Sequence, residues 1–326
     1  MTMTDRSRRG HFALISNPLS QRNRRGMEAI EAVLDDLPGI DHYKLGDVAE
    51  MPDILRHLAA DGTRVVALNG GDGTVQAGLT HILEDRPFES PPAIAILPRG
   101  MTNMTAADVG LTGRPGSALR KLHRGLAGDG PEPAIRNRHV LRLENAAGFP
   151  PQRGMFFGAA AIVQAIELCR DRVHSLGLEA ALANGVTLLG LLANWLFRGA
   201  EGSVLRGENV SIRIDGEVRP EAERLLVLAT TLDRLVLGSR PFWNDDREPL
   251  RFTAIDYPPD HLFRRAGKLL YGGPERALPA GYRSCGAGRV ELDMTCRFTL
   301  DGQLYDPEPG KPVILSAADR LDFLRI

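Results

Sequence analysis

A glycine-rich turn is the part of the sequence whose residue types most directly suggest chemistry. Residues 67–76 read ALNGGDGTVQ, in which apolar residues typical of a buried strand lead into three glycines placed around Asp72. A turn without Cβ atoms lets backbone N–H groups approach a ligand closely, and the positive end of a following helix dipole favours an anion. The residues predicted to surround a phosphate group here are Asn69, Gly70, Gly71, Gly73 and Thr74.

Asp72 has a different predicted role, because a carboxylate beside a phosphate is repulsive unless it performs chemistry. It could hold a divalent metal ion or accept a proton from an attacking hydroxyl group. The alternative interpretation is a tight strand-to-helix turn with an exposed aspartate. The stretch is neither a P-loop nor a dinucleotide fingerprint, since the Lys-Ser/Thr ending and the G-x-G-x-x-G spacing are both missing. Asp72 is therefore a candidate catalytic residue.

The elements around this turn alternate between strand-like and helix-like patterns. Strands are predicted over 11–16, 64–69 and 93–98, and helices over 22–37, 51–62 and 74–85. Short apolar strands alternating with amphipathic helices are typical of an α/β layer fold with a largely parallel sheet. We expect residues 1–138 to form an α/β nucleotide-binding domain.

The pattern changes after Arg136. Short β-like runs interrupted by Gly, Pro and Asp occupy 138–145, 154–160, 209–215, 224–231, 250–256, 289–294 and 297–302. They predict a mainly antiparallel, sandwich-like second domain over 139–326, with a helical insertion over 161–196. The last strand could belong to this domain or return to the first.

Two further loops follow predicted strands, at 16–26 (SNPLSQRNRRG) and 97–110 (LPRGMTNMTAADVG). Because the carboxyl ends of parallel strands meet at one sheet edge, where α/β folds bind ligands, the three loops are expected to converge. Arg99 could pair with a phosphate bidentately or be an ordinary surface charge. The nucleotide-binding candidates in these two loops are Asn17, Ser20, Arg99, Gly100, Thr102 and Asn103.

The motifs NPLS (17–20), GGDGT (70–74) and LPRGMTN (97–103) resemble those of the diacylglycerol kinase catalytic domain family, which includes sphingosine kinases and bacterial lipid kinases. This resemblance implies an ATP-binding α/β domain followed by a β-sandwich-like domain that receives a lipid. It also implies Mg²⁺ as cofactor and transfer of the ATP γ-phosphoryl group to a hydroxyl of a diacylglycerol-like or long-chain lipid alcohol. The sequence DGQ (301–303) occupies the place of the family's terminal Asp-Gly-Glu, which makes Gln303 the second candidate catalytic position.

Several positions depart from the family pattern. Gln303 cannot accept a proton as the family's glutamate is thought to do, and Met101 and Met104 stand where Thr and Asp are usual. An acid expected near the start of the second domain is replaced by Arg136 or Asn137. Besides an active lipid kinase, two alternatives stay open: a nucleotide- or lipid-binding relative without catalysis, and an NAD kinase, which shares Gly-Gly-Asp-Gly. Whatever the chemistry, Asp301-Gly302 predicts a hairpin turn.

Composition limits the partners. The 326 residues contain 40 Lys plus Arg against 41 Asp plus Glu, so no strong field recruits nucleic acid. Three cysteines without metal-ligand spacing and the lack of a signal-peptide pattern predict a cytoplasmic protein. The apolar segment 186–197 is shorter than the roughly 20 residues of a membrane-spanning helix. It either forms core, or contacts an acyl chain or the inner membrane surface as a peripheral anchor. The oligomeric state stays open, a homodimer included.

Overall fold

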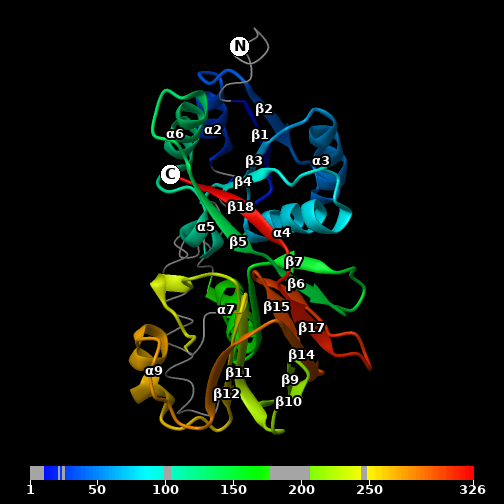
Figure 1. The fold of residues 1–326 in the computed structure, drawn as a ribbon, viewed down its shortest axis with the longest axis vertical. Helices are drawn as coiled ribbons and strands as arrows, with labels where there is room; N and C mark the ends of the chain where they lie inside the picture. Colours follow the sequence, from blue (N-terminus) through cyan, green and yellow to red (C-terminus); the bar gives the residue numbers. More distant parts are fainter. Residues whose placement is uncertain (1–10, 21–22, 24–25, 99–103, 177–205, 244–247) are drawn as a thin grey trace. The chain divides into compact units, whose positions relative to one another are not determined.

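A computed structural model describes residues 11–20, 23, 26–98, 104–176, 206–243 and 248–326. The chain divides into two compact units. The first contains Met1–Arg138 together with Arg320–Ile326, and the second contains His139–Asp319. Each unit is described by itself below (Figure 1).

The first unit is built on a six-stranded sheet with the order β2-β1-β3-β4-β18-β5. Four neighbouring pairs, β2-β1, β1-β3, β3-β4 and β4-β18, are parallel. The strands predicted near 11–16, 64–69 and 93–98 are all present. The bounds are β1 Phe12–Ser16, β2 Ile40–Lys44, β3 Val65–Asn69, β4 Ala93–Ile96, β5 Ala134–His139 and β18 Arg320–Arg325.

Helices cover both faces of this sheet (Figure 1). Phe12 and Leu14 of β1 share a core with Ile30 of α2 and Leu119 of α6. On the other face, α4 comes so close to β3 that a Cβ on Gly78 would lie 3.0 Å from Leu68 Cδ1. The helices in the described part of this unit are α2 Met27–Leu34, η1 Val48–Glu50, α3 Met51–Ala60, α4 Asp72–Thr80, the π-helical turn η2 His81–Asp85, α5 Met104–Val109 and α6 Pro115–Ala127.

The second unit contains a twelve-stranded sheet that curls on itself, with β16-β15-β8-β11-β9-β14-β17-β6-β7 as its main path. Its strand pairs are antiparallel, for example β11 with β12 and β14 with β17. The predicted fold class, a largely parallel α/β domain plus a mainly antiparallel β domain, is therefore confirmed. The strands are β6 Leu141–Glu144, β7 Gln152–Gly154, β8 Phe156–Ala160, β9 Glu208–Ile214, β10 Glu217–Val218, β11 Glu223–Thr230, β12 Leu250–Asp256, β13 Tyr282–Ala287, β14 Arg289–Met294, β15 Phe298–Leu300, β16 Gln303–Tyr305 and β17 Val313–Ser316.

The core of the second unit lies between the inward faces of these strands. Alternating residues of β9 and β14, such as Ile212 and Leu292, meet Phe157 of β8 and Phe252 of β12. Among the described residues of this unit, the helices are α7 Ala161–Leu176, the short η4 Val236–Gly238 and α9 Leu262–Tyr271. The helix predicted over 161–196 is present up to Leu176, and the rest of it lies outside the described residues.

The hairpin predicted at DGQ is present. Leu300 of β15 pairs with Gln303 of β16, so Asp301 and Gly302 form a two-residue turn. Both have positive φ, 47° and 88°, which is the geometry of a type I′ turn and the reason that Asp-Gly suits it.

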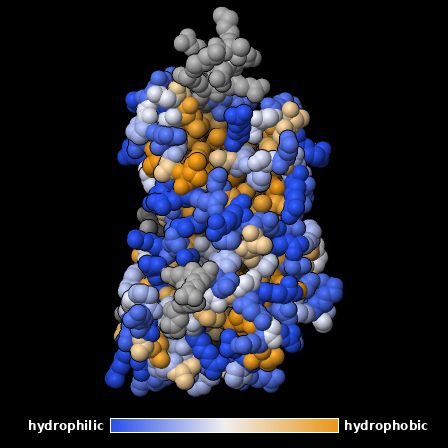
Figure 2. Space-filling view, viewed as in Figure 1, coloured by the Kyte–Doolittle hydropathy of each residue, from blue (hydrophilic) through white to orange (hydrophobic). Residues whose placement is uncertain are grey.

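The surface seen in Figure 2 is a mosaic in which hydrophilic side chains surround separate hydrophobic patches. In the part of the chain that the structure describes, no helix has the length and apolar character that crossing a bilayer requires. The segment 186–197, expected to be core or a lipid contact, lies outside that part.

Candidate active site

The loop after β1 (residues 16–26) and the glycine-rich turn after β3 (residues 70–74) are joined directly by hydrogen bonds. Asn17, which follows β1, donates from Nδ2 to Thr74 Oγ1 at 3.0 Å, and its backbone N–H donates to Asn69 O at 2.9 Å. Asn17 Oδ1 also accepts the N–H of Leu19 at 2.9 Å, which closes an Asx turn. The Ser20 hydroxyl donates a hydrogen bond to Asn17 O at 3.0 Å. The two loops are therefore joined into one hydrogen-bonded assembly at the sheet edge.

Asn23 completes this assembly, although the sequence patterns did not single it out. It is fully buried, and its Nδ2 donates both to Asn17 O at 2.9 Å and to Asn69 O at 2.8 Å. One amide group thus holds the ends of β1 and β3 together. The only signal in the sequence was an asparagine within the polar segment NPLSQRN, which does not distinguish a buried bridge from a surface residue.

A second buried network lies beneath the loops. Asn69 is fully buried, and its Nδ2 donates to Ser16 Oγ at 2.9 Å. His42 Nε2 lies 2.9 Å from the same Ser16 hydroxyl. Burial lowers the pKa of His42, and the positive charge of Lys44 lowers it further. The neutral imidazole is therefore the form that this site favours.

Helix α4 begins at Asp72, two residues earlier than predicted, and Gly71 is its N-cap. Thr74 lies in the first turn, and its hydroxyl accepts the hydrogen bond from Asn17. Asp72 and Gly73 form the half-buried first turn. A carboxylate at this end is favoured by the helix dipole, which explains how Asp72 is tolerated beside a predicted anion site.

The neighbouring glycines Gly70 and Gly71 have different surroundings. A Cβ on Gly70 would lie 2.5 Å from the Thr74 side chain, so packing alone demands glycine there. A Cβ on Gly71 would meet only Ser20 Cβ, at 3.9 Å, among the described residues. Its φ of −74° and ψ of 178° suit any residue. Among the residues that the structure describes, the space in front of Gly71 is therefore open.

The third predicted loop is only partly described. Arg99, Gly100, Met101, Thr102 and Asn103 lie outside the described residues, so their predicted roles stay predictions. Met104, where the family usually has Asp, is the first residue of α5 and is buried, with 8% of its surface exposed. At this position an apolar packing contact replaces a carboxylate.

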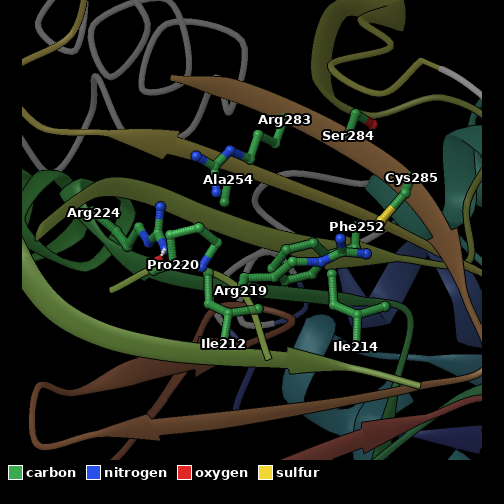
Figure 3. Close-up of a pocket in the computed structure, with 10 residues that line it drawn as sticks. All are labelled: Ile212, Ile214, Arg219, Pro220, Arg224, Phe252, Ala254, Arg283, Ser284 and Cys285. Carbon is green, nitrogen blue, oxygen red and sulfur yellow. Dashed lines mark hydrogen bonds between the residues drawn. The ribbon is translucent and has the colours of Figure 1, made fainter. Parts of the chain in front are cut away.

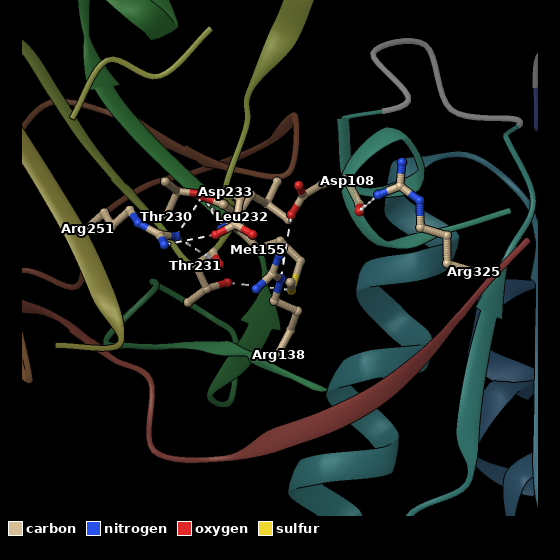
Figure 4. A network of polar contacts seen from close by, with 9 residues as sticks. All are labelled: Asp108, Arg138, Met155, Thr230, Thr231, Leu232, Asp233, Arg251 and Arg325. Atoms are coloured by element: carbon tan, nitrogen blue, oxygen red, sulfur yellow. Dashed lines mark hydrogen bonds and ion pairs between the residues drawn. The ribbon is translucent and has the colours of Figure 1, made fainter. Parts of the chain in front are cut away.

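The helix after the third loop is anchored by an acid that the motif analysis passed over. Asp108 of α5 is buried, and its Oδ2 lies 3.7 Å from Arg138 Nε of β5. Its backbone carbonyl accepts a hydrogen bond from Arg325 Nη1 of β18 at 2.8 Å (Figure 4). These contacts fasten α5 to the sheet. The signal available was an isolated acid five residues beyond Asn103, which carries no pattern of its own.

Gln303 lies in the second unit, at the start of β16, and its side chain is exposed. The preceding Asp301 is buried, and its two carboxylate oxygens accept the N–H groups of Met155 and Phe156, each at 2.9 Å. Asp301 therefore ties the hairpin to the start of β8. Within DGQ, the aspartate holds the turn and the glutamine is presented outward.

The described residues do not fit a Mg²⁺ site supplied by the protein alone, since no three of their His, Cys, Asp or Glu side chains form a metal-holding group. Arg136, one of the positions where an acid was expected, is exposed on β5. The other, Asn137, donates to Asp322 Oδ1 of β18 at 2.7 Å. An acid thus lies beside Asn137, contributed by a strand from a different part of the sequence.

Comparison with known proteins bears on both units. Residues 11–129 match the family model of the diacylglycerol kinase catalytic domain. The resemblance indicated by the loop motifs is confirmed for this part of the chain. No curated protein matches the chain.

Solved structures from Bacillus anthracis str. Sterne share the fold over nearly the whole chain. A candidate diacylglycerol kinase aligns with a TM-score of 0.67 and 17% identity, covering 97% of this chain and 96% of its own. A second aligns with a TM-score of 0.64 and 16% identity, covering 97% of each. A third, described as a diacylglycerol kinase, has a TM-score of 0.61 and 15% identity over 96% of this chain and 97% of its own. At these identities the likeness establishes the architecture.

Proposed function

We propose that this protein is an ATP-dependent lipid kinase that phosphorylates a hydroxyl of a diacylglycerol-like or long-chain lipid alcohol. The family match over residues 11–129 supports the kinase class. The hydrogen-bonded assembly of the first two loops supports a nucleotide site at that sheet edge. The third loop, with Arg99, Gly100, Thr102 and Asn103, is proposed to complete the site.

The observation that carries this proposal is the contrast between Gly70 and Gly71. Packing explains the first glycine, but nothing described within 3.9 Å explains the second. Gly71 caps a nine-residue helix whose first backbone N–H groups point out of its N-terminal end. A phosphate in front of Gly71 would satisfy those groups and would need the space that a side chain takes. Asn17 and Ser20 would then border the phosphates, with Asn69 supporting the strand end from below.

Asp72 is proposed to act as the base. It would accept the proton of the lipid hydroxyl while that oxygen forms a bond to the γ-phosphorus, and the bond from the γ-phosphorus to its bridging oxygen breaks as ADP leaves. Mg²⁺, if it takes part, would arrive with the nucleotide phosphates, where it neutralises charge. Gln303 is proposed to border the lipid without exchanging a proton.

The test uses two matched glycine substitutions. ADP with Mg²⁺ should raise the melting temperature of the wild-type protein, because a ligand that binds only the native state stabilises it. Gly71→Ala should leave the melting temperature without ligand unchanged and should reduce or abolish the ADP shift. Gly70→Ala should lower the melting temperature without ligand, because its Cβ would overlap Thr74. Gly267→Ala is the control, since a Cβ there meets nothing within 4 Å.

Activity is then measured as ATP-dependent phosphorylation of a lipid extract, with NAD as a parallel acceptor. Labelled lipid supports the proposal, and labelled NADP would identify an NAD kinase instead. An ADP shift without any labelled product would identify a binding relative that lacks catalysis. A Gly71→Ala protein that binds ADP as tightly as the wild type would remove Gly71 from the site.

A further inference from the structure

A cavity of about 380 Å³ lies within the second unit and uses none of the residues of the three nucleotide loops. Strand β9 pairs with β11 only at Asn209 with Glu223 and Glu208 with Arg224. Beyond these pairs β9 continues along β14, while β11 continues along β12 and β8. The cavity lies where the strands diverge (Figure 3).

The walls of this cavity are apolar. Ile212 and Ile214 of β9 form one side, and Phe252 and Ala254 of β12 form the other. All four are buried members of the core of the second unit. Cys285 of β13 also lines the cavity. The space is therefore an extension of the hydrophobic core, suited to a hydrocarbon chain.

Three arginines also line the cavity: Arg219, Arg224 and Arg283. Arg224 is completely buried, with one Nη paired to Asp256 and the other donating to Pro220 O at 2.5 Å. Its Nε–H has no acceptor among the described residues. Arg283 Nη2 lies 3.6 Å from the same Asp256 carboxylate, so one acid serves two guanidinium groups.

Arg219 adds positive charge with little compensation. Its Nη1 lies 3.6 Å from Glu217, whose side chain is 76% exposed and therefore well solvated. Its buried Nε–H finds no acceptor in the described parts of the chain. Figure 3 shows its side chain reaching toward Phe252 and Cys285. Donors held in an apolar setting without acceptors are costly, and an anion beside them would remove that cost.

We infer that this cavity binds a single-chain anionic amphiphile. The carboxylate or phosphate headgroup would lie at Arg219, Arg224 and Arg283, and the hydrocarbon chain would lie between the β9 and β12 walls. The volume falls at the lower end of the roughly 300–1,000 Å³ range of small-molecule pockets, which favours one acyl chain over two.

Protection of Cys285 from alkylation tests this inference, with peptide mapping to read each thiol separately. Cys296, another half-buried thiol, is the internal reference. Burial raises the pKa of both thiols, that of Cys296 to about 11, so the reaction is run in alkaline buffer. Dodecanoate and dodecyl phosphate, at ten times their Kd, should each slow alkylation of Cys285 about tenfold and leave Cys296 unaffected. Binding of both would identify the anionic chain as the shared requirement, and binding of one would identify the headgroup.

Arginine variants make the test specific, with affinities measured by calorimetry. Arg219→Gln and Arg283→Gln should each weaken dodecanoate binding about tenfold, the usual scale for losing one charged hydrogen bond. Arg213→Gln is the matched control, because Arg213 lies on β9 but pairs with Glu291 at 2.8 Å on the outer surface. Equal protection by the neutral dodecyl maltoside, or by inorganic phosphate alone, would overturn the inference. So would a double variant, Arg219→Gln with Arg283→Gln, that binds dodecanoate as tightly as Arg213→Gln.

Discussion

Asn17 Nδ2 and Thr74 Oγ1 lie 3.0 Å apart although 57 residues separate them in the chain. This hydrogen bond joins the loop after β1 to the first turn of α4 through two side chains. It makes the geometry of one loop depend on the other.

The first prediction concerns this bond. Asn17→Ala should lower the free energy of unfolding by about 2 kcal/mol, since two hydrogen bonds of roughly 1 kcal/mol each are lost, to Thr74 and from the Leu19 N–H. It should also weaken ADP binding. Urea denaturation of Asn17→Ala, Thr74→Val and the double variant forms a cycle that isolates the pair. A coupling free energy near zero would show that the two side chains act independently.

The second prediction concerns Asp72. Asp72→Asn should reduce turnover about a hundredfold or more, the scale expected for loss of a positioned proton acceptor. Its effect on the free energy of unfolding should stay within about 1 kcal/mol, because asparagine keeps the shape of the side chain and the favourable charge lost at the start of α4 contributes at most that much. Glu28→Gln, which removes an acid from the first turn of α2, is the matched control and should keep full activity. Wild-type turnover in Asp72→Asn would show that Asp72 is a structural residue of the turn and not the base.

The third prediction separates the two side chains of the DGQ hairpin. Gln303→Glu should leave folding unchanged, because the side chain is exposed, and should leave lipid phosphorylation unchanged or lower, since Asp72 is the proposed base and a second carboxylate is not needed. Asp301→Ala should instead lower the free energy of unfolding by about 3 kcal/mol, because two buried N–H groups lose a charged acceptor. Chemical denaturation and a lipid phosphorylation assay measure the two effects. A faster Gln303→Glu enzyme would mean that the missing carboxylate limits turnover.

The fourth prediction is a pH dependence of stability that originates at His42. Burial lowers its pKa in the folded protein below the ordinary value of 6.5, with a further contribution from Lys44 that Glu31 opposes. Below pH 6.5 the unfolded chain takes up a proton more readily than the native protein, so the free energy of unfolding should fall as the pH drops. The free energy of unfolding of His42→Gln, measured by urea denaturation, should fall less between neutral and mildly acidic pH than that of the wild type. His57→Gln is the control, because the side chain of His57 is 62% exposed.

The strands that position the loops could be predicted because their chemistry is local. β1, β3 and β4 are covered on both faces, which requires short continuous apolar runs, and such runs are visible in the sequence. β2 has no such run, since Ile40–Lys44 reads IDHYK and is only half-buried. Its pattern therefore gave no indication of a strand.

The parts of the candidate site that sequence could not predict depend on contacts between distant residues. Asn23 donates to the backbone carbonyls of Asn17 and Asn69. Every residue has a backbone carbonyl, so no residue type at the partner positions reveals this contact in the sequence. The start of α4 at Asp72 was missed because glycines on both sides of it suggested a turn. Arg219, Arg224 and Arg283 line one cavity only because the second sheet curls, which no spacing along the chain reveals.

The position of β18 has a consequence for how the protein is made. This strand lies between β4 and β5, and its Phe323 is completely buried. During synthesis, the other five strands of the first sheet therefore leave the ribosome long before β18, which lies between β4 and β5. Until residues 320–326 emerge, the edges of β4 and β5 remain open to pairing with other chains. We expect the second unit to finish folding first during synthesis, so that the nucleotide loops, although encoded early, become rigid last.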